Sequence, residues 1–124
     1  MITQSKTILV VDDDPSITAF VRMALEDEGY RVATTVGGQT MQLARDLRPA
    51  VILLDIAMPG MDGVEVSERL RDDPRTAAIP IIVMSAQDRL QAPSTRMHAD
   101  DRLPKPFDLD HLYQKVERWA VTSS

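Results

Sequence analysis

The stretch VILLD at residues 51–55 is the strongest indication of the fold of this chain. Its four apolar residues are followed by the carboxylate Asp55, and the segment IAMPGMDG at residues 56–63 comes next. A short, wholly apolar run is typical of a strand that is covered on both faces of a parallel sheet. Proline and glycine in the next segment indicate a loop. Asp55 is therefore predicted at the carboxyl edge of a sheet, where open α/β folds bind their ligands.

Other predicted strands also end in polar side chains. The run ILVV at residues 8–11 precedes Asp12, Asp13 and Asp14, and the run IIVM at residues 81–84 precedes Ser85. Strand and helix patterns alternate along the chain, which indicates βα units and a parallel sheet. Polar alternation in the second strand favours a place nearer the edge of the sheet. The expected strands are 7–11, 30–34, 50–54 and 80–84, and then a short last strand that leads to the segment LPKPF at 103–107.

The helices are predicted from apolar spacing and from capping residues. Asp14 is the expected N-cap of the first helix, with Pro15 at its first position and Gly29 just after its end. Further helices are expected at 41–47, at 64–71 and after Asp108. The segment 87–99 should hold the remaining helix, but Pro93 and a weak apolar pattern predict a short or irregular one.

Length and composition limit the class of protein. The 124 residues suffice for one domain, so residues 1–124 are expected to form a single domain. A net charge of −5 argues against direct nucleic-acid binding, and the lack of cysteine excludes disulfides and thiolate chemistry. No apolar run is long enough for membrane insertion, and the first residues do not resemble a signal peptide. A cytoplasmic location is expected.

The polar residues at the strand ends predict a site for a divalent cation and a phosphoryl group. If Asp12, Asp13 and Asp55 lie close together, they raise one another's pKa unless a cation lies between them. Mg²⁺ is the natural choice, because it prefers oxygen ligands and shares phosphate oxygens. Lys105 can add a positive charge and Ser85 a hydroxyl donor. The simpler interpretation, helix capping, is preferred for Asp14 and is weaker for Asp12 and Asp13.

Four motifs together resemble the receiver domain of two-component response regulators over nearly the whole chain. They are VDD at 11–13, LDIAMPGMDG at 54–63, MSA at 84–86 and KPF at 105–107. The resemblance implies a flavodoxin-like (βα)5 three-layer sandwich with a parallel five-stranded sheet in the order 2-1-3-4-5. It also implies that Asp55 accepts a phosphoryl group from a sensor histidine kinase or a histidine phosphotransferase. Phosphorylation would then change the binding of a downstream protein target.

The same resemblance implies roles for individual residues. Ser85 and Lys105 would bind the phosphoryl oxygens, and the Lys105–Pro106 peptide would be cis, as it often is in receivers. Whether the module also catalyses its own phosphorylation and dephosphorylation is left open. The implied ligands of Mg²⁺ are Asp13 and Asp55 directly, Asp12 through water, and the backbone carbonyl of Ala57.

Two departures from the family pattern concern signal output. Receivers usually carry tyrosine or phenylalanine three residues before the lysine, where this chain has Arg102. A charged guanidinium would not enter an apolar pocket unpaired, so we expect Arg102 to stay in solvent or beside an acid in both phosphorylation states. The spacing from Ser85 to Lys105 is also shorter than is usual in the family, and the deficit falls in the predicted irregular helix.

Several functions remain open on the sequence alone. The leading hypothesis is a stand-alone receiver, and the runner-up is the receiver part of a longer regulator or hybrid kinase. A phosphohydrolase that forms an aspartyl-phosphate would combine the same residue types. Its nucleophile, however, normally lies early in the chain with a general acid two residues on, where this chain has Ala57. A flavodoxin-like cofactor binder is disfavoured, because three acids would repel a flavin phosphate.

Overall fold

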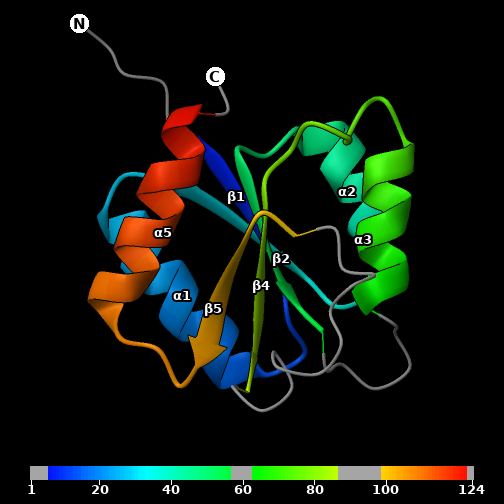
Figure 1. The fold of residues 1–124 in the computed structure, drawn as a ribbon. Coiled ribbons are helices and arrows are strands. Elements are labelled where there is room, and N and C mark those ends of the chain that lie inside the picture. Colours follow the sequence, from blue (N-terminus) through cyan, green and yellow to red (C-terminus); the bar gives the residue numbers. More distant parts are fainter. Residues whose placement is uncertain (1–5, 57–62, 87–98, 123–124) are drawn as a thin grey trace, which may run out of the picture.

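The computed structural model describes residues 6–56, 63–86 and 99–122. A parallel five-stranded sheet lies between two layers of helices (Figure 1). The strand order β2-β1-β3-β4-β5 confirms the predicted flavodoxin-like order, and β2 lies at an edge as expected. The strands are β1 (Thr7–Val11), β2 (Arg31–Thr35), β3 (Val51–Asp55), β4 (Ile81–Ala86) and β5 (Asp101–Lys105).

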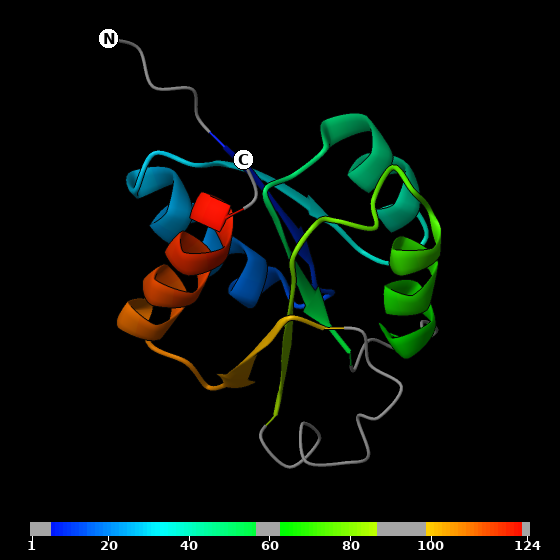
Figure 2. The same ribbon diagram turned by 45° about the horizontal axis from the view of Figure 1, so that its top comes forward.

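The helices divide between the two faces of the sheet. Figures 1 and 2 show α1 and α5 on one face and α2 and α3 on the other. The helices connect parallel strands by crossing over one face of the sheet or the other, as in doubly wound folds. The helices are α1 (Pro15–Asp27), α2 (Thr40–Leu47), α3 (Gly63–Asp72) and α5 (Leu109–Thr122).

The central strands supply both hydrophobic cores, because successive side chains of a strand point to opposite faces. In β1, Ile8 and Val10 belong to the core under α1 and α5, whereas Leu9 and Val11 belong to the core under α2 and α3. All five residues of β3 are buried, including Asp55. The apolar run that predicted this strand is therefore explained by cover on both faces.

Capping groups hold both ends of α1 as predicted. The Asp14 carboxylate accepts hydrogen bonds from the backbone N–H groups of Ser16 and Ile17, and Pro15 occupies the first position of the helix. At the other end Gly29 has a φ of 96°, the left-handed region that glycine adopts without strain. Asp108 caps α5 in a similar way, since its side chain accepts a hydrogen bond from the N–H of His111.

Ser85 and two leucines depart from the simplest pattern of the sequence. Ser85 lies inside β4 rather than after it, because β4 continues to pair with β5 through Ser85↔Pro104 and Ala86↔Lys105. Two leucines of the apolar helix patterns are exposed, Leu47 by 40% and Leu109 by 41%. Each stands at the terminus of its helix, where neighbouring turns no longer surround the side chain. The predicted helix in 87–99 lies almost wholly outside the described residues, as only Ala99 is included.

In the described part of the chain, every helix is too short or too polar to cross a membrane.

Candidate functional site

A cluster of carboxylates lies at the carboxyl edge of the sheet. Asp12 and Asp13 follow the end of β1, Asp55 is the last residue of β3, and β1 and β3 are adjacent strands. One carboxylate oxygen from each residue lies within 4.8 Å of the other two. The prediction that these acids lie together is therefore confirmed. Their proximity follows from the parallel sheet, which brings the ends of neighbouring strands to the same edge.

The acids of the cluster differ in burial. Asp12 is 2% exposed and Asp55 is 4% exposed, whereas Asp13 is open to solvent. Burial raises the pKa of the Asp12 carboxyl, and the neighbouring charge of Asp55 raises it further. Hydrogen bonds from Lys105 and from the backbone N–H of Asp14 lower that pKa without cancelling the rise. The site thus holds negative charge that the surrounding protein only partly compensates.

Lys105 is the last residue of β5, and its side chain contacts this cluster. Its Nζ lies 2.9 Å from Oδ2 of Asp12 and 3.4 Å from Oδ2 of Asp55. Burial alone would lower the pKa of Lys105, but the hydrogen bonds and charges of the two aspartates outweigh it and raise that pKa. Because an ion pair favours both charged forms, the raised pKa of Asp12 reflects burial and the second acid rather than a poor contact with Lys105.

The backbone around these side chains fixes their direction. The N–H of Asp14 donates a hydrogen bond of 2.9 Å to Oδ1 of Asp12, so the first turn before α1 orients a buried acid of the cluster. From the sequence, Asp14 was expected only to cap the helix, and this contact was not expected because nearly any residue type could supply the backbone amide. The Lys105–Pro106 peptide is cis, as expected.

Two of the predicted site residues are not placed by the structure. Ala57 lies outside the described residues, so its backbone carbonyl stays a predicted ligand. Ser85 is placed only as a backbone position in β4, opposite Pro104 of β5. Since Lys105 follows Pro104, Ser85 stands near the same edge of the sheet as the lysine. Its contact with a phosphoryl oxygen likewise stays a prediction.

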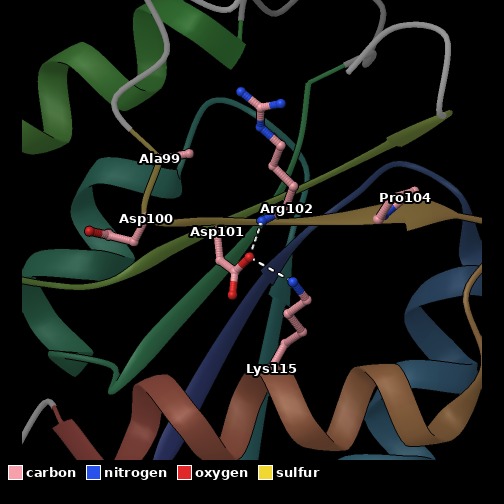
Figure 3. Close-up of a pocket in the computed structure, with 6 residues that line it drawn as sticks. All are labelled: Ala99, Asp100, Asp101, Arg102, Pro104 and Lys115. Atoms are coloured by element: carbon pink, nitrogen blue, oxygen red, sulfur yellow. Dashed lines mark hydrogen bonds and ion pairs between the residues drawn. The ribbon is translucent and has the colours of Figure 1, made fainter. Parts of the chain in front are cut away.

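Arg102 occupies the position at which receivers usually carry an aromatic residue. Its side chain is exposed and points away from α5, whereas the neighbouring Asp101 points toward that helix (Figure 3). The two side chains lie on opposite faces of β5, as the alternation of side chains along a strand requires. The pocket at this position has a volume of about 520 Å³ and is lined by Ala99, Asp100, Asp101, Arg102, Pro104 and Lys115.

Comparisons with known proteins agree with this geometry. Residues 8–117 match the model of the response regulator receiver domain. The chain is 43% identical over 114 residues to the DNA-binding dual master transcriptional regulator RpaA of Synechocystis, covering 88% of this chain and 46% of that protein. It is 36% identical to protein PilH of Pseudomonas aeruginosa, covering 88% of this chain and 93% of that protein. The chain thus spans about half the length of the first relative and nearly all of the second.

Solved structures show the same fold. The receiver domain of the sensor histidine kinase PA1611 from Pseudomonas aeruginosa, with a magnesium ion coordinated in its active-site cleft, superimposes with a TM-score of 0.86 at 29% identity. That alignment covers 95% of this chain and 99% of the other. The chemotaxis response regulator CheY4 of Vibrio cholerae gives a TM-score of 0.83 at 29% identity, covering 93% and 98%. The fold, the acid cluster and the match over residues 8–117 together show that this chain belongs to the response regulator receiver domain family.

Proposed function

We propose that Asp55 accepts a phosphoryl group from a histidine kinase or a histidine phosphotransferase. The observation that carries the proposal is the position of Asp55 beside Asp12, Asp13 and Lys105 at the open edge of the sheet. In the transfer, the phosphorus–nitrogen bond of a phosphohistidine breaks and a bond from phosphorus to a carboxylate oxygen of Asp55 forms. The released imidazole keeps the electron pair of the broken bond and takes a proton from solvent.

The donor set at this edge fits Mg²⁺. All three side chains offer carboxylate oxygens, which hard divalent cations prefer, and the exposed Asp13 leaves one side of the cluster open to water and to a phosphate. Asp12, Asp13 and Asp55 would hold the ion. Bound there, it would neutralise the negative charge that gathers when a phosphoryl group approaches three acids.

Lys105 holds its charge in the right place before any phosphoryl group arrives. Its ammonium already contacts the buried oxygens of Asp12 and Asp55, so it needs only a small movement to reach an oxygen of a group bound to Asp55. A phosphoryl group carries about −1.5 to −2 charges at neutral pH. The contact with Lys105 would therefore strengthen when Asp55 is phosphorylated, and it would compete with the contact to Asp12.

Downstream, the phosphorylated domain would act by changed binding to a protein target. The relatives include a regulator named as DNA-binding, but the chain covers only 46% of that protein, and the matched part is the receiver. A direct role in nucleic-acid binding is not proposed for this chain, whose net charge is −5.

Acetyl phosphate with Mg²⁺ supplies a direct test, because it replaces the unknown kinase. The intact mass of the wild-type protein should increase by one phosphoryl group, and Asp55→Asn should remove that increase. Asp27→Asn is a matched control, since Asp27 is an exposed acid at the end of α1 outside the cluster. If Asp55→Asn is labelled as fully as the wild type, the assignment is wrong. If the assignment holds, phosphotransfer assays with the histidine kinases of the source organism, tried one at a time, would identify the donor.

A further inference from the structure

Gly63, the first residue of α3, lies unusually close to the residue that follows Asp55. A Cβ atom added to Gly63 would lie 2.7 Å from Cα of Ile56, and 3.0 Å from both its Cβ and its Cγ2. Carbon atoms in contact prefer a separation of about 3.5–4.0 Å. From the sequence, the proline and glycine residues of the segment 56–63 indicated only a loop. The structure gives a different reason for glycine here, namely that a side chain would overlap the backbone of Ile56.

Ile56 cannot easily move away from this contact. Its N–H donates a hydrogen bond of 3.3 Å to the carbonyl oxygen of Met84 in β4, which continues the pairing of Asp55 with Met84. Its side chain packs against the core under α2 and α3. The nearest atom to the added Cβ is a backbone atom, which no rotamer change can displace. A methyl group at position 63 would therefore press on the backbone next to Asp55.

The Asp55 carboxylate can move little without loss of its contacts. Asp55 is 4% exposed, its Oδ2 lies 3.4 Å from Nζ of Lys105, and its carboxylate lies within 4.8 Å of two other acids. Sites of this kind require their groups to be held within about 0.5 Å of the working geometry. We propose that Gly63 is a positioning residue, whose missing side chain lets α3 pack directly on Ile56 and so fixes Asp55 relative to Asp12, Asp13 and Lys105. The inference rests on the proposed metal and phosphoryl site.

Substitution of Gly63 by alanine tests the proposal through metal affinity rather than through phosphorylation. Titration of each protein with Mg²⁺, followed by backbone amide NMR, gives the affinity, and urea unfolding shows whether the variant is folded. Gly63→Ala should weaken Mg²⁺ binding by about ten-fold or more, as loss of a supporting contact around a metal site commonly does. Gly38→Ala is the matched control, because a Cβ there meets no atom within 4 Å. It should leave affinity unchanged.

A double variant separates positioning from general destabilisation. Ile56→Ala removes Cγ2, one of the three atoms that the added methyl would press on, and most of the core packing that holds the Ile56 backbone in place, so this backbone can yield to the methyl. If the effect of Gly63→Ala passes through Ile56, it should be smaller in the Ile56→Ala background than in the wild type. An equal loss of affinity in the two backgrounds would contradict the proposal. If Gly63→Ala does not fold, Ile56→Ala alone decides, because loosening the same contact should also weaken Mg²⁺ binding.

The outcomes distinguish this inference from the function on which it rests. A wild-type protein that does not bind Mg²⁺ would overturn both. A wild-type protein that binds Mg²⁺, together with a folded Gly63→Ala variant of the same affinity, would overturn the role of Gly63 and leave the proposed function intact.

Discussion

Asp101, the first residue of β5, anchors that strand to α5. Its Oδ1 lies 2.7 Å from Nζ of Lys115, and its Oδ2 accepts a hydrogen bond of 2.8 Å from Nε1 of Trp119. Burial raises the pKa of the Asp101 carboxyl, but these contacts and the N–H of Arg102 outweigh it and bring that pKa below its usual value. No local pattern of the sequence indicates these partners, which lie 14 and 18 residues away on α5.

Asp101→Asn should destabilise the protein by about 1.5 kcal/mol or more at pH 7, because it removes a charge-assisted hydrogen bond from a mostly buried pair. A lowered pKa means that the contribution is complete above the unfolded value, near pH 3.9, and is lost as the pH falls through the folded value. Urea unfolding should therefore show a gap between wild type and variant that is constant from pH 7 to about 5 and shrinks below about 4. Asp27→Asn, an exposed acid, is the control. A gap that persists unchanged in acid would contradict the assignment.

Some residues of the site could be placed from the sequence and others could not. Asp12, Asp13, Asp55 and Lys105 were placed correctly, because each follows or ends a strand and parallel strands share one carboxyl edge. The close approach of Gly63 to Ile56 was missed. Glycine in a loop looks the same in a sequence whether it serves a turn or leaves room for a neighbouring backbone.

Helix α1 links local sequence directly to the site. Asp14 caps its N-terminus through bonds to two backbone N–H groups, and its own N–H orients Asp12. The first turn of α1 contains no acidic residue, so Asp14 supplies the negative charge that favours a helix N-terminus. Among the described elements, this helix was predicted with its boundaries intact, because capping residues are a local signal.

Asp14→Ala should cost about 1 kcal/mol of unfolding free energy, the usual cost of losing an N-cap side chain. Asp14→Asn is the matched control, since asparagine caps as well as aspartate and should keep most of that stability. Chemical denaturation of the two variants beside the wild type provides the measurement. Equal stability of all three proteins would show that the cap contributes nothing, and equal losses in both variants would point to the charge rather than to the hydrogen bonds.

Across the whole molecule, the sheet brings together residues that are far apart in the chain. Lys105 lies 93 residues from Asp12, and the two meet because β5 and β1 run parallel in one sheet with their carboxyl ends at one edge. Arg102 lies on the same strand as Lys105, but its side chain is exposed and points away from α5. The acid cluster at the edge of the sheet and the exposed surface around Arg102 are thus connected by one short strand.

We expect Arg102 to stay exposed when Asp55 is phosphorylated, because burial of its guanidinium without a partner is costly. Crystal structures with and without beryllofluoride, a phosphoryl mimic, should show the side chain in solvent or beside an acid in both states. Arg102→Tyr should leave the rate of phosphorylation by acetyl phosphate unchanged, while it alters affinity for a downstream target. A swing of Arg102 from exposed to buried would contradict this expectation, as would a changed phosphorylation rate in Arg102→Tyr.

Local patterns of the sequence predicted the order of elements, the buried strands and the residues at the carboxyl edge. Apolar runs, caps and turn residues are local signals. In a parallel sheet the carboxyl ends of the strands then lie at one edge, so the residues after the strands lie there too. Tertiary structure alone decided which atoms meet: the amide of Asp14 with Asp12, Lys115 and Trp119 with Asp101, and the backbone of Ile56 with Gly63. Such contacts depend on the relative placement of segments that the chain brings together only on folding, and no local pattern records them.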